Sequence, residues 1–204
     1  MLFAAPDGSL EVRAESDGSR TLRGRFPYNS LATLSDGGRR GRPRKEKFAS
    51  HAFQYSVNAE VDIRLLVGHD WAKPLASRAT QSLALDDSAE ALTFEANIAP
   101  EVADTSHFKD AMALLAAGLA VGISPGFRIP PERTVDNAET VEEEDPSEGQ
   151  ALIRTVHEAI LFELSLVTNP AYEESSVEAR SWQPNPSGWN RRNLAALERA
   201  LLHL

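Results

Sequence analysis

Short runs of alternating or β-branched residues recur along most of the chain, and they limit the folds open to it more than any other feature. Paired runs over 10–26 and over 81–98, the second pair meeting around 86–88, each predict a hairpin. Residues 61–67 predict a buried strand, and 151–168 predict one long strand or two consecutive ones. No glycine-rich phosphate loop and no regular strand–helix alternation is present, which argues against a nucleotide-binding α/β fold. We therefore expect an α+β or mainly β domain.

Helical periodicity is confined to three segments. The clearest is 104–118, whose apolar stripe is formed by Phe108, Met112 and Leu115. Residues 47–57 predict a shorter helix, and 190–204 predict an amphipathic helix that follows a proline- and serine-containing linker. We accordingly expect one domain over 1–180, with the linker and the C-terminal helix over 181–204.

Composition excludes several classes of protein. The net charge of −9 argues against duplex binding, so we expect no nucleic-acid partner. The absence of cysteine excludes disulfides, thiolate metal sites and a cysteine nucleophile, so covalent catalysis would have to use Ser, Thr, Lys or a carboxylate. No apolar run has the length of a membrane span and no signal-peptide pattern opens the chain, so we expect no membrane contact and a location in the cytoplasm or within a particle.

Two charged segments lie between the predicted strands. Residues 38–47 carry six basic side chains among glycine and proline, so we expect no regular element there. This segment is either a solvated loop or a docking patch for an acidic partner. Residues 136–148 form a polar stretch whose acidic block, 142–145, predicts a solvated loop inserted between strands.

Three polar side chains lie at or within predicted strands and suggest chemistry. His69 follows the strand 61–67, Ser124 ends a strand that we expect to stop at Pro125, and Glu163 lies inside the last apolar run. Because the residue before a proline favours extended backbone, the strand-to-helix serine elbow of α/β-hydrolases is excluded. A serine becomes a nucleophile when a base takes its proton and a third group orients that base. The three residues supply these roles if the fold brings them together.

The surroundings of these side chains leave alternatives open. Period-two geometry puts Glu163 and Ser165 on one face of their strand, and we favour a half-exposed face over a buried carboxylate with a partner. Gly122 and Gly126 flank Ser124 and permit a close backbone approach, as needed to aim N–H groups at an oxyanion.

A metal-assisted hydrolase that uses His69 and Asp70 is a rival interpretation. With Glu163 these residues would offer hard ligands, but no HExxH or comparable pair supports such a site. We therefore expect no metal and no cofactor. Asp70 is either a supporting partner of the site or, as we favour, the cap of the turn that follows it.

Three motifs together resemble those of the phage prohead proteases, the serine peptidases that mature the capsids of tailed phages. GHDWAKPLAS resembles their histidine motif, LAAGLAVGISPGF their serine motif and FELSLVTNPAYEES their third motif, in the order typical of the family. The resemblance covers roughly residues 20–180. Pro125 departs from it, because many members carry an aliphatic residue there.

The resemblance implies that Ser124 is the nucleophile, His69 the general base and Glu163 the residue that orients the imidazole. Relatives among the herpesvirus capsid-assembly proteases use a second histidine as the third member, which makes His157 the competing assignment. A compact, mainly antiparallel β-barrel-like core with surrounding helices, similar to the herpesvirus enzymes, is the implied fold. Arg128 would add positive potential near the oxyanion.

The same resemblance implies a serine endopeptidase that cleaves scaffold and major capsid precursor proteins inside the assembling prohead, in the host cytoplasm. Self-cleavage near the C-terminus and a homodimer are further expectations, the second by analogy with the herpesvirus enzymes only. The alternative is a non-catalytic capsid-assembly factor that retains the protease fold.

Overall fold

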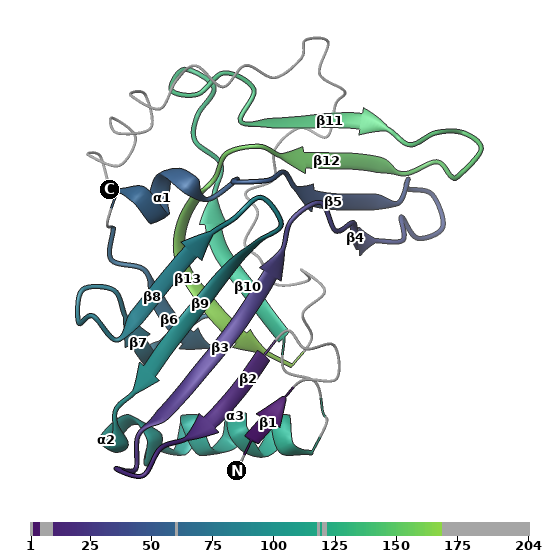
Figure 1. Cartoon of the computed structure of the whole chain (residues 1–204). Helices are drawn as coiled ribbons and strands as arrows, with labels where there is room; N and C mark the ends of the chain where they lie inside the picture. The colour runs from purple at the N-terminus through teal and green to yellow at the C-terminus, as the bar shows by residue number, and fades with distance from the viewer. Residues whose placement is uncertain (1, 5–9, 60, 118, 120–121, 169–204) are drawn as a thin grey trace.

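The computed structural model describes residues 2–4, 10–59, 61–117, 119 and 122–168 (Figure 1). The predicted C-terminal helix and the division of the chain at residue 180 lie outside these residues and stay predictions. The described residues form thirteen strands and three short helices, so the expectation of a mainly β, α+β chain is confirmed.

The first sheet is antiparallel throughout, with the strand order β1-β2-β3-β9-β8. Its strands are Leu2–Ala4 (β1), Leu10–Ala14 (β2), Arg20–Pro27 (β3), Leu83–Asp87 (β8) and Ala91–Ile98 (β9). Both predicted hairpins are confirmed, because β2 pairs with β3 and β8 pairs with β9 across short polar turns.

The second sheet has the order β10-β13-β6-β7. Its strands are Gly122–Arg128 (β10), Ile160–Val167 (β13), Arg64–Val67 (β6) and Asp70–Ser77 (β7). The expectation that β10 stops at Pro125 is wrong, because the strand continues to Arg128. The strand β10 lies at an edge of its sheet, which is the position in a sheet where proline is tolerated. Pro74 lies in β7, at the opposite edge of the same sheet.

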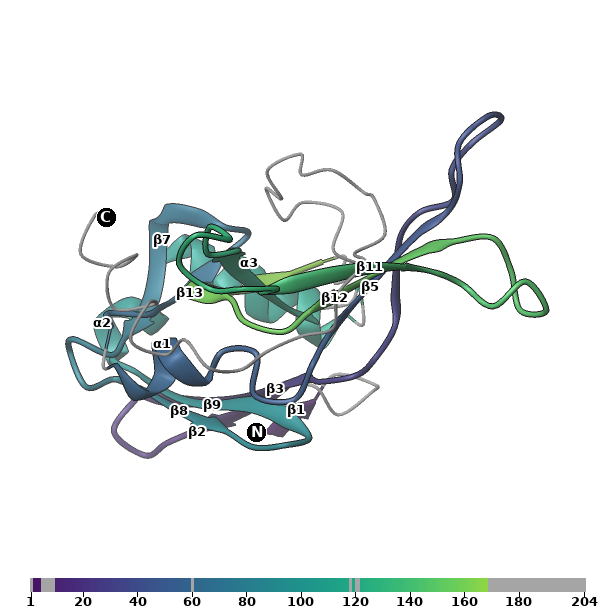
Figure 2. The same cartoon turned by 90° about the horizontal axis from the view of Figure 1, so that it is seen from above.

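The third sheet has the order β11-β12-β5-β4 and extends away from the other two (Figure 2). Its strands are Glu139–Glu143 (β11), Leu152–Val156 (β12), Arg44–Phe48 (β5) and Ala32–Ser35 (β4). The two charged segments therefore contribute strands, and the expectation that both are entirely loops is wrong. Ion pairs also join the two segments: Arg42 Nη1 lies 2.9 Å from Glu143 Oε1, and Lys45 contacts the buried carboxylate of Glu144.

A buried ion pair explains how the highly charged β5 occupies an inner position of this sheet. Glu46 is fully buried, and its Oε2 accepts a hydrogen bond of 2.8 Å from Arg154 Nη1 on the neighbouring β12. Arg154 also contacts Glu139 on β11. Burial raises the pKa of Glu46, while the guanidinium of Arg154 opposes that rise. The charge of β5 argues against a strand when the sequence is read alone, but in the sheet Glu46 is paired with Arg154 of the neighbouring strand.

In the part of the chain that the structure describes, three helices join the sheets: Gln54–Asn58 (α1), Pro100–Ala103 (α2) and Ser106–Ala116 (α3). The predicted helix 104–118 is confirmed as α3, which buries Phe108 and Leu115. The helix predicted over 47–57 is wrong in its first half, because Phe48 ends β5 and His51 has a φ of 63°. No helix in the described ranges is both long and apolar enough to cross a membrane.

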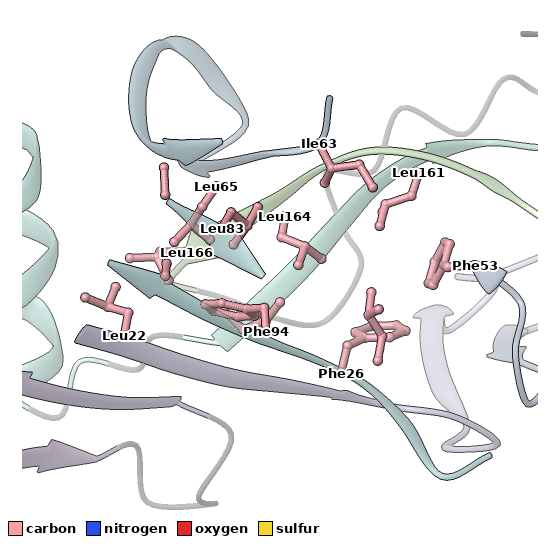
Figure 3. Close-up of a cluster of buried hydrophobic side chains, with 14 of the residues drawn as sticks. Leu22, Phe26, Phe53, Ile63, Leu65, Leu83, Phe94, Leu161, Leu164 and Leu166 are labelled. Atoms are coloured by element: carbon pink, nitrogen blue, oxygen red, sulfur yellow. The ribbon is translucent and has the colours of Figure 1, made fainter. Parts of the chain in front are cut away.

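The main core lies between the first and second sheets, which form two facing layers (Figures 1 and 2). Figure 3 shows Leu164 and Leu166 of β13 on the side of the second sheet that faces Leu22 and Phe94 of the first. The described strands form open sheets and do not close into a barrel, so the expectation of a barrel-like core is wrong. The likeness to the herpesvirus fold stays a prediction. Because of this two-layer arrangement, one side of β13 faces the core, and the opposite side can carry polar groups.

Candidate active site

The central strand β13 aligns the polar residues of the second sheet. In its antiparallel register with β10, Ser165 lies opposite Ser124, and Glu163 lies opposite Gly126. Residues directly opposite each other share a face of the sheet, and residues two apart on one strand do so as well. Ser124, Ser165 and Glu163 therefore lie on one face. The apolar residues between them, such as Leu164, fill the core on the other face.

A two-residue turn carries His69 to this face. β6 runs parallel to β13, and the chain reverses at once into β7, with Val67 opposite Asp70. Gly68 and His69 between them have φ values of 63° and 57°. Positive φ at both central residues is the requirement of the type I′ hairpin turn, and histidine tolerates it better than most residues do. The Gly68 N–H donates to the Leu166 carbonyl at 2.9 Å, which ties the turn to β13.

The imidazole of His69 lies between the other two side chains. Its Nδ1 is 2.6 Å from Glu163 Oε1, and its Nε2 is 3.1 Å from Ser124 Oγ. An ionised carboxylate can only accept, so Nδ1 carries the proton and Nε2 is left to accept the hydroxyl proton of Ser124. The structure thus brings together all three residues that the sequence singled out, in the order of contacts that a hydroxyl, a base and an orienting acid require.

Burial of Glu163 decides between the two sequence interpretations of this residue. Glu163 is only 4% exposed, so the expectation of a half-exposed strand face is wrong. A buried carboxylate needs hydrogen bonds, and this one has partners in His69 and Ser165. Ser124 is also buried, at 4% exposure, whereas the side chain of His69 is 20% exposed.

Ser165 is a part of the site that the sequence analysis did not assign. Its Oγ accepts a 2.9 Å hydrogen bond from the backbone N–H of His69 and donates a 2.6 Å hydrogen bond to Glu163 Oε2. Its place two residues after Glu163, on the same strand face, was the available signal. The hydrogen bond with the His69 N–H could not be predicted in this way, because His69 lies 96 residues away in the chain.

Gly126 is needed for a reason other than the backbone freedom expected from the sequence. A Cβ at this position would lie 2.0 Å from Glu163 Oε1 and 2.7 Å from its Cδ. The side chain of Glu163 therefore crosses β10 directly over Gly126 on its way to His69. Only a residue without a side chain leaves that path open.

We expect Gly126→Ala to fold and to lose about 100-fold in catalytic rate, the scale of loss for a displacement of about 1 Å in a reacting array. The added methyl group displaces the carboxylate from His69. Gly149→Ala is a matched control, because a Cβ there would lie 2.2 Å from Glu144 Oε2, outside this site. Labelling rates with a fluorophosphonate, together with thermal unfolding, measure both variants. Equal labelling rates for the two variants would contradict this account.

Other residues considered from the sequence lie elsewhere or have other contacts. Asp70 begins β7, so the expectation that it caps a turn that follows it is wrong. Its Oδ1 accepts a hydrogen bond of 2.9 Å from the Ala72 N–H, and that bond and Lys73 hold the pKa of Asp70 below its usual range. The guanidinium of Arg128 lies 5.7 Å from the ring centre of Phe162.

The competing third member, His157, contacts a different strand. Its Nε2 is 2.9 Å from Thr140 Oγ1 on β11. Within the described part of the chain, no group of three or more His, Asp and Glu side chains is placed to hold a metal ion.

A serine, a histidine and a glutamate in successive hydrogen-bond contact define the class of serine hydrolases. Comparison with known families carries the identification further: residues 9–186 of 204 match the family described as Caudovirus prohead serine protease, and the chain belongs to this family. It is therefore a serine peptidase of phage capsid maturation. No curated protein and no solved structure matches the chain significantly.

Proposed function

We propose that this chain is the endopeptidase that cleaves scaffold and major capsid precursor proteins during prohead maturation, with Ser124 as nucleophile, His69 as general base and Glu163 as orienting acid. The observation that carries the proposal is the position of the His69 ring, 2.6 Å from Glu163 Oε1 and 3.1 Å from Ser124 Oγ. Membership of the prohead serine protease family supports capsid-related proteins as substrates.

In the proposed reaction, Ser124 Oγ bonds to the carbonyl carbon of the scissile peptide while its proton moves to His69 Nε2. The C–N bond then breaks, and His69 returns that proton to the leaving amine, which leaves an acyl-enzyme. In the second half, water attacks the carbonyl carbon of the ester and gives a proton to His69 Nε2. The bond to Ser124 Oγ then breaks, and His69 returns the proton to Oγ as the new carboxyl product leaves. Throughout, Glu163 holds Nδ1–H and stabilises the imidazolium that forms twice in each cycle.

Charge on the carbonyl oxygen needs donors as well. Backbone N–H groups near Ser124 are the proposed donors, and loss of one such donor typically costs about 100-fold to 1,000-fold in rate.

The proposed setting is the interior of the assembling prohead in the host cell, where enclosure restricts the protease to capsid-related proteins. Co-expression of the chain with the scaffold and capsid precursor of the same phage tests the function. We expect intact-mass spectrometry to find shortened forms of both proteins, and a fluorophosphonate adduct on the peptide that contains Ser124. Unprocessed substrates together with an unlabelled Ser124 would instead favour a non-catalytic assembly factor.

A further inference from the structure

We propose that Ser165 is a positioning residue for the reaction: its hydroxyl links the carboxylate of Glu163 to the turn that carries His69. The inference rests on the proposed function, because it concerns how the base and the orienting acid are held. Ser165 is fully buried on β13, between Glu163 and the turn, and it faces Ser124 across the strand pair.

The hydrogen-bond chemistry gives the Ser165 hydroxyl a single orientation. The backbone N–H of His69, 2.9 Å from Ser165 Oγ, can only donate, so the hydroxyl oxygen accepts from it. The one hydroxyl proton is then directed to Glu163 Oε2, at 2.6 Å. This leaves Oε1 of the same carboxylate to accept from His69 Nδ1. The three bonds close a ring that joins the main chain and the imidazole of His69 through Ser165 and Glu163.

This ring constrains both ends of the His69–Glu163 contact. Each oxygen of the Glu163 carboxylate accepts from a different donor. The carboxylate therefore cannot rotate about the Cγ–Cδ bond without losing a hydrogen bond. The turn is held at the same time, and its backbone lies in the positive-φ region that needs support from its surroundings. Loss of the hydroxyl would leave a buried N–H and a carboxylate oxygen each short of a partner. The ring of His69 would then spend less time aligned with Ser124.

The test uses the purified full-length chain and a fluorescent fluorophosphonate that reacts at Ser124. We expect Ser165→Ala to lower the maximal labelling rate by about 10- to 100-fold. This range corresponds to the free-energy cost of an unsatisfied buried polar group when that cost is added to the activation barrier. The half-saturating probe concentration should stay unchanged, because Ser165 acts through His69 and Glu163 and does not touch the probe. A role in folding alone would change neither quantity once the amount of folded protein is matched by thermal unfolding.

Ser165→Thr and Ser165→Val form a matched pair, since they have nearly the same shape and differ in the hydroxyl. We expect the Thr variant to label at least about 10-fold faster than the Val variant, by the same energetic argument. We also expect the downfield proton NMR resonance of the His69 Nδ1–H to persist with Thr and to be lost or broadened with Val and Ala. This resonance reports the contact with Glu163 directly, whether or not labelling is fast.

Two results would overturn the inference: a folded Ser165→Ala protein that labels at the parental rate, or a Thr and a Val variant that react equally fast. Ser124→Ala separates this failure from failure of the proposed function. If Ser124→Ala does not label while Ser165→Ala behaves like the parent, only the role of Ser165 is lost. If Ser124→Ala still labels and still processes substrate, the proposed function itself is wrong.

Discussion

Ser124→Ala is expected to abolish processing of the capsid precursor, with a loss of rate on the order of a million-fold, as removal of the nucleophile causes in other serine proteases. The reason is that no acyl-enzyme can form without Oγ, which is the atom 3.1 Å from His69 Nε2. Co-expression with the precursor, followed by intact-mass spectrometry of the capsid protein, measures the effect.

The fold should survive this change, because alanine removes one hydroxyl and adds no volume to β10. Ser147→Ala is the control, since Ser147 lies on an exposed turn with its hydroxyl bonded to Asp145. Equal processing by Ser124→Ala and by Ser147→Ala would remove Ser124 from the mechanism. Matched thermal unfolding curves of the two variants would exclude misfolding as the cause of a difference.

Glu163→Gln is expected to lower the maximal rate by about 10,000-fold, the size of the loss when the orienting carboxylate of a serine protease becomes an amide. A glutamine no longer favours the proton on Nδ1, because its amide group can donate as well as accept. A ring protonated on Nε2 cannot take the proton of Ser124. Single-turnover labelling with a fluorophosphonate measures the loss.

Two controls accompany this prediction. Glu142→Gln makes the same chemical change at an exposed position of the edge strand β11 and should leave the rate unchanged. His157→Gln tests the competing third member; with His157 contacting Thr140, we expect nearly full activity. If His157→Gln fails while Glu163→Gln labels at the parental rate, the assignment passes to the pair of histidines.

The residue types of the site could be predicted from the sequence, but their surroundings could not. His69, Ser124 and Glu163 stood out because polar side chains interrupt apolar strand patterns, and the structure brings them into contact. Their catalytic roles stay proposals. The role of Ser165 was not predicted, because one of its two hydrogen bonds is with a backbone N–H 96 residues away. No local pattern reports such a contact.

Two of the errors in the fold share one cause, the position of a strand within its sheet. Pro125 predicts a stop when read locally, yet it lies within an edge strand of the second sheet, as Pro74 does at the opposite edge. An edge strand is the position in a sheet where proline is tolerated. The charge of β5 misled in the same way, because the partner of Glu46 is Arg154 on a neighbouring strand.

By itself the sequence determined the alternation that makes hairpins, the helix α3, and the three motifs that mark a serine peptidase, because these depend on neighbouring residues and on residue type. Only the tertiary structure decided that Glu163 is buried, that Gly126 must lack a side chain, and that the turn at His69 meets β13. Those features depend on which strands lie side by side. Chain positions dozens of residues apart become neighbours there through sheet pairing, and a linear pattern carries no record of it.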